Sequence, residues 1–85
     1  MKNSDQLLEM LRDKFDIESL ALRLDSDTTI LVFNNNYMFE FSNQIFRDVD
    51  DFGVGVKVMY DTLVSMILHD YAEEILRRDW YYDSN

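Results

Sequence analysis

The sequence predicts a single α+β domain over residues 1–85: a leading helix, a three-stranded antiparallel meander, a short helix or turn, and a long C-terminal helix packed on one face of the sheet. Three observations predict it. Apolar residues recur at helical spacing near both ends of the chain, they alternate at strand spacing in between, and 85 residues are too few for two separate cores.

The leading helix is expected from about Ser4 to Lys14, where Asn3 or Ser4 can cap the first turn and Asp5 favours the positive end of the helix dipole. Its apolar stripe consists of Leu7, Leu8, Leu11 and Phe15.

Alternation begins at Ile17 and predicts the first strand, with Leu20, Leu22 and Leu24 facing the core. After turn residues around Asp25, the β-branched and aromatic run 28–33 predicts a central strand.

A hairpin should follow, because Asn34 and Asn35 tolerate the positive φ angles of a two-residue turn. That turn would place Val32 opposite Tyr37, and Ile30 opposite Phe39, at the start of a third strand over residues 37–41.

Residues 42–58 are ambiguous between two structures. Ser42 could cap a short helix that carries Ile45, Phe46 and Val49, whereas the segment 53–56 could be a fourth strand or a hinge. The strongest helical period in the chain then predicts a helix from about Lys57 to Asp79.

Composition limits the function classes. The chain contains 17 Asp and Glu against eight Lys and Arg, a formal net charge of −9, which disfavours direct binding to nucleic acid or to an anionic membrane. It has no cysteine, which excludes disulfides and thiolate metal sites. With no bilayer-spanning apolar run and no leader pattern, we expect a cytoplasmic protein.

No motif predicts an enzyme. His69 is the only imidazole, and its neighbours Ser65 and Glu73 complete neither a catalytic triad nor a three-ligand metal site. The glycines of 53–55 lack the remainder of a phosphate-binding loop, and Asp48, Asp50 and Asp51 lack the spacing of a calcium loop. We therefore expect no catalytic residue, cofactor or metal.

Carboxylates recur in clusters that could contact a basic partner. On the first helix they lie four residues apart, about 6 Å along the axis, and so share one face. We expect Trp80, Tyr81 and Tyr82 to supply apolar anchors, or alternatively to fold back and close the core. The predicted anionic contacts are Asp5, Glu9, Asp13, Asp48, Asp50 and Asp51, with Asp70, Glu73 and Glu74 in addition.

In size, charge and order of elements, the chain resembles small acidic phage anti-CRISPR proteins, inhibitors of RNA-guided nucleases. The resemblance implies a non-enzymatic inhibitor, acting in a bacterial host cell, that mimics nucleic acid and blocks the DNA- or RNA-binding surface of a basic partner such as a CRISPR effector nuclease.

The alternative is a protein-interaction module, or a homodimeric subunit of a larger complex that associates through the C-terminal helix. Met59 and Met66 flank the apolar stripe of that helix and make it wider than one small sheet covers.

Overall fold

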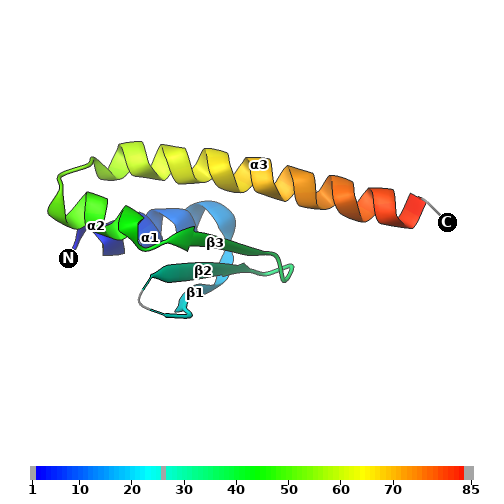
Figure 1. Cartoon of the computed structure of the whole chain (residues 1–85), viewed down its shortest axis with the longest axis horizontal. Coiled ribbons are helices and arrows are strands. Elements are labelled where there is room, and N and C mark those ends of the chain that lie inside the picture. The colour runs from blue at the N-terminus through cyan, green and yellow to red at the C-terminus, as the bar shows by residue number, and fades with distance from the viewer. Residues whose placement is uncertain (1, 26, 84–85) are drawn as a thin grey trace.

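The chain folds into three helices and one three-stranded sheet (Figure 1). The elements, in order, are α1 (Asn3–Phe15), β1 (Ile17–Arg23), β2 (Thr28–Phe33), β3 (Met38–Ser42), α2 (Gln44–Asp51) and α3 (Val56–Asp83). The computed structural model describes residues 2–25 and 27–83, except for the side chains of positions 20 and 78–83. The strands are antiparallel in the order β1-β2-β3, so the predicted α+β meander with its leading and closing helices is confirmed.

The core forms where one face of the sheet meets the helices. Strand β3 alternates strictly, with Phe39 and Phe41 buried and their neighbours exposed, as a strand with one solvated face should. The helices bury Leu7 and Leu11 from α1, and Leu63 and Ile67 from α3, against these strands.

The β2–β3 hairpin differs from the predicted one by one residue in register. Val32 pairs with Met38 rather than with Tyr37, and Ile30 pairs with Glu40. The reason is a three-residue loop: Phe33 and Tyr37 close it through their backbones, and Asn36 takes the left-handed conformation at φ 67°. An asparagine run permits either loop length, because asparagine tolerates positive φ.

The predicted orientation of β1 is wrong. Leu22 and Leu24 are 50% and 67% exposed, whereas Ile17 is buried and Ala21 packs against the core; the side chain of Leu20 lies outside the described residues. Ile17 directly follows the left-handed C-cap of α1 at Asp16, which starts the strand with its odd-numbered positions inward. Two register irregularities against β2 also interrupt the alternation.

Residues 44–51 form the predicted short helix, and the segment 53–56 forms no fourth strand. The N-cap residue of this helix is Asn43 rather than the predicted Ser42, although the backbone N–H of Gln44 donates to Ser42 Oγ at 3.1 Å. Beyond α2, Gly53 adopts φ 73°, a conformation that glycine takes without strain, and the chain turns into α3.

Helix α3 is longer than the rest of the domain is wide. Its 28 residues correspond to about 42 Å at 1.5 Å per residue, in a molecule of 50 × 24 × 21 Å. Figure 1 shows its C-terminal half running past the hairpin into solvent. Within residues 2–25 and 27–83, no helix combines the length and the apolar character required to cross a membrane.

Candidate protein-binding groove

An apolar groove of about 380 Å³ lies where α3 passes over the β2–β3 hairpin and the end of α1. Four of its lining side chains are aromatic and two are aliphatic, while Asp16, Asn34 and Asn35 supply its polar edge. The apolar lining consists of Phe15, Phe33, Tyr37, Ile67, Leu68 and Tyr71. This composition, mostly apolar with few polar groups, is typical of binding sites.

The aromatic side chains hold the groove in shape. The rings of Phe15, Phe33, Tyr37 and Tyr71 form a chain of contacts with centroid separations of 5.7, 5.2 and 5.0 Å. Such tilted and edge-on pairs are favourable beyond the area they bury. The groove therefore has a preformed wall on the side of the hairpin.

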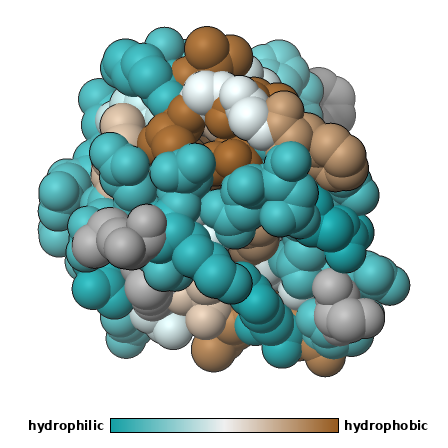
Figure 2. Space-filling view, turned by 90° about the vertical axis from the view of Figure 1, so that its left-hand side faces the viewer, coloured by the Kyte–Doolittle hydropathy of each residue, from teal (hydrophilic) through white to brown (hydrophobic). Residues whose placement is uncertain are grey.

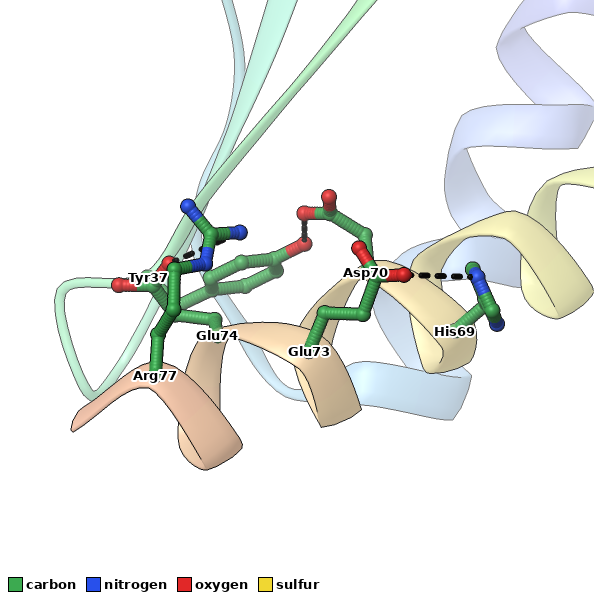
Figure 3. A network of polar contacts seen from close by, with 6 residues as sticks. All are labelled: Tyr37, His69, Asp70, Glu73, Glu74 and Arg77. Atoms are coloured by element: carbon green, nitrogen blue, oxygen red, sulfur yellow. Dashed lines mark hydrogen bonds and ion pairs between the residues drawn. The ribbon is translucent and has the colours of Figure 1, made fainter. Parts of the chain in front are cut away.

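Two hydrogen bonds fasten the middle of α3 to the hairpin. The Tyr37 hydroxyl donates to Asp70, as Figure 3 shows, and Asn35 Nδ2 donates to the Tyr71 hydroxyl at 2.7 Å. Burial, and then the hydrogen bond to Asp70, raises the pKa of Tyr37 far above its ordinary value of 10.0, so the phenol stays protonated and continues to donate.

The apolar surface continues along α3 beyond the groove. Leu68 is 52% exposed although it lines the groove, and Ile75, seven residues later on the same side of the helix, is 38% exposed. Ala72 lies between them and is also exposed. An incoming helix or extended segment could contact the groove and this stripe together.

One carboxylate lines the groove, and two more act on its Tyr37 side chain. Asp16 lines it directly, Asp70 holds the Tyr37 hydroxyl, and the charge of Glu74 contributes to the raised pKa of Tyr37. Arg77 lies 3.7 Å from Glu74 in an exposed pair, which neutralises this edge only in part. The groove is thus apolar inside and negative at its edge.

A larger hollow of about 760 Å³ lies at the opposite end, between α1, α2 and the end of β1. It is a poorer candidate because its charges offset each other: Lys2, Arg23 and Arg47 line it together with Asp5, Asp50 and Asp51. Figure 2 looks onto this end, where hydrophilic side chains dominate and apolar ones gather along the α3 side.

The predicted anionic contacts separate into groups with different surroundings. Asp5, Glu9 and Asp13 are all exposed on the side of α1 opposite its buried leucines, as their spacing predicts. Glu73 is paired with His69 at 3.1 Å, and Glu74 with Arg77. The predicted contacts therefore lie on three different helices, α1, α2 and α3.

Asp50 and Asp48, on α2, accept hydrogen bonds from within the fold. Asp50 accepts hydrogen bonds from the Ser4 backbone N–H at 2.9 Å and from Ser4 Oγ at 2.8 Å, which lowers the pKa of Asp50 below its ordinary value. Asp50 thus accepts from a backbone N–H in the first turn of α1, whose N-cap residue is Lys2, so the predicted cap by Asn3 or Ser4 is wrong. Asp48 accepts from Gln44 Nε2 at 2.9 Å.

The predicted aromatic anchors continue α3. The backbone of Trp80, Tyr81 and Tyr82 is helical to Asp83, so this segment extends the helix. Their side chains lie outside the described residues.

Sequence reasoning missed the groove itself. It assigned Tyr71 and Phe15 to helix stripes, and both assignments hold; it assigned Tyr37 to a strand, but β3 begins one residue later, at Met38. The signal that could have found the groove is the coincidence of several aromatic residues near the hairpin with a helix too long for the sheet. Only the packing of three distant segments brings these residues together.

His69 is exposed and contacts Glu73 only as an i,i+4 pair on the helix surface. Across the part of the chain that the structure describes, no group of three or more histidine or carboxylate side chains could hold a metal ion.

No protein-family model matches this chain, and comparisons with the curated proteins and with the solved structures return no significant match.

Proposed function

We propose that this chain is a non-enzymatic protein-binding module that recognises a positively charged surface of another protein. The observation that carries the proposal is the exposed aliphatic side of α3, with Leu68 and Ile75 half in solvent beside an aromatic groove. Soluble monomers rarely expose contiguous apolar patches unless these bind something.

The charge of the chain supports a basic partner. A net charge of −9 attracts a cationic surface over long range and speeds association, while it opposes contact with other acidic proteins. Apolar anchors would supply most of the affinity, because exposed charge pairs contribute little.

A nucleic-acid mimic is a second candidate within the same class of partner. The observation that favours it is the row of Asp5, Glu9 and Asp13, all exposed along α1 with the spacing of one helical turn. In this version the basic surface is a nucleic-acid-binding site, such as that of a CRISPR effector nuclease, and α1 occupies it.

The test is affinity capture from a bacterial lysate at low and high salt, followed by titration of each recovered protein, once purified, against this chain. We expect a basic partner whose association rate falls steeply as salt rises. Loss of labelled DNA or RNA from that partner on addition of the chain would support mimicry. If no purified partner binds, or if binding does not respond to salt, the proposal is wrong.

A variant separates the two candidates. Reversing Asp5, Glu9 and Asp13 to lysine should abolish binding if α1 imitates nucleic acid, and should mainly slow association if the groove supplies the affinity. Val58→Asp is the control for general changes to the surface, because Val58 is exposed near the N-terminus of α3.

A further inference from the structure

We infer that the groove between α3 and the hairpin binds a cationic amphipathic segment, in which one or two bulky apolar side chains enter the groove and flanking Lys or Arg residues contact its acidic edge. The inference rests on the proposed function and deepens it, because it assigns the surface and the kind of peptide that the surface accepts.

The interior of the groove selects the apolar part of this segment. Its walls are aromatic, and a space of about 380 Å³ accommodates large side chains such as leucine, phenylalanine or tryptophan. Leu68 and Ile75 extend the apolar surface along the helix, so anchors spaced by one or two helical turns would meet both.

The edge of the groove selects the sign of the flanking charges. Asp16 stands at the end of α1, and Asp70 and Glu74 stand on α3 near Tyr37, so carboxylates border the groove on two sides. Two cations lie near these carboxylates along the chain: Arg77, which contacts Glu74, and Lys14, in the last turn of α1. A peptide with acidic flanks would meet like charges, whereas lysine or arginine would meet partners.

The same charges argue against a second copy of this chain as the occupant. The α3 stripe of a second copy would bring its own Asp70, Glu73 and Glu74 toward the acidic edge, together with another net charge of −9. Self-association at this surface is therefore opposed electrostatically, most strongly at low salt.

The experiment is selection from a displayed random 12-residue peptide library on the immobilised full-length chain. We expect enriched peptides to combine bulky apolar residues at helical spacing with an excess of Lys and Arg. A representative is then synthesised, labelled and titrated against purified variants by fluorescence anisotropy.

The groove variant is Leu68→Asp, and its matched control is Val58→Asp, which changes another exposed aliphatic residue ten positions earlier on the same helix. We expect Leu68→Asp to weaken the peptide by about tenfold or more, and Val58→Asp by less than about twofold.

The edge variant is Asp16→Asn with Asp70→Asn. Asparagine tolerates the left-handed conformation at position 16, and at position 70 its oxygen can still accept from Tyr37. We expect binding about five- to tenfold weaker at low salt, with the difference shrinking at high salt. Asp16→Asn alone serves if the double variant unfolds, and Asp5→Asn with Glu9→Gln removes equal charge away from the groove.

Several results would overturn the inference: no enriched peptide, enrichment of acidic or uncharged peptides, equal loss in Leu68→Asp and Val58→Asp, or concentration-dependent dimerisation that Leu68→Asp abolishes. If a basic partner from the lysate still binds a Leu68→Asp variant but not the α1 charge reversal, the proposed function survives and the groove assignment fails.

Discussion

The two halves of α3 follow the same helical pattern and have different surroundings. In the first half, Leu63 and Ile67 are 0% and 2% exposed in the core; in the second half, Ile75 and Leu76 are 38% and 64% exposed. Tyr71 is the last described side chain along α3 that packs against the core. Apolar periodicity thus identifies the apolar face of a helix, but it does not show whether the domain itself buries that face.

This difference gives the exposed apolar residues of α3 a possible role in binding that the buried ones lack. Burial of Leu63 stabilises the fold, and its contacts are complete within the chain. Leu68 and Ile75 gain nothing comparable, so the same residue types there are available to a partner. Four substitutions test the contrast.

Leu63→Ala should have the largest effect. Removing a fully buried side chain leaves a cavity among tightly packed neighbours, so we expect a loss of about 2–5 kcal/mol in the free energy of unfolding. Urea denaturation followed by circular dichroism measures it. A loss below about 1 kcal/mol would mean that this half of α3 is not part of the core.

Tyr37→Phe tests the point where the two halves meet. It deletes the hydroxyl that holds Asp70, so we expect a loss of about 1 kcal/mol at neutral pH in the same assay. The phenyl ring remains, so the groove should keep its aromatic wall.

The pH dependence of this variant adds an independent check. The pKa of Tyr37 is raised in the folded state, so its stabilising contribution is present below the ordinary value of 10.0 and is lost as the pH rises through the folded pKa. The stability gap between wild type and Tyr37→Phe should therefore narrow above about pH 10. A gap that stays constant to high alkali would contradict the assigned hydrogen bond.

Asp50→Asn sharpens the comparison because it tests a helix end that is hydrogen-bonded to the rest of the domain. At the start of α1, Ser4 donates to Asp50. The pKa of Asp50 is lowered by its bonds from Ser4, so its contribution is present above the ordinary value of 3.8 and is lost as the pH falls through the folded pKa. We expect a modest loss of stability at pH 7 that disappears in acid. Thermal melts from pH 7 to pH 2 measure it, with the exposed Asp5→Asn as control.

Leu76→Ala should have the smallest effect. The side chain is 64% exposed, and alanine favours helix, so we expect a change within about 0.5 kcal/mol. Measured beside Leu63→Ala, it compares the same substitution in the two halves of one helix. A loss approaching that of Leu63→Ala would show that the second half is covered in solution, by another part of the chain or by a second copy.

Local patterns predicted most of the fold, and the failures have a common cause. The helices, the three strands and their order followed from periodicity. The orientation of β1 and the hairpin register did not. A shift of one residue reverses the face of a strand or changes its pairing, and here the left-handed residues Asp16 and Asn36 set that shift. The contact of Asp50 with Ser4 was not predicted, since a carboxylate pattern does not reveal a donor 46 residues away.

By itself, then, the sequence determined the α+β architecture, the acidic surface of α1 and the apolar positions of α3, because each of these depends on neighbours within about one helical turn or one strand. Only the tertiary structure decided which half of α3 is buried and that aromatic residues from α1, the hairpin and α3 enclose a groove. These features depend on how segments that are distant in the sequence pack together, and the local spacing of apolar residues does not encode that packing.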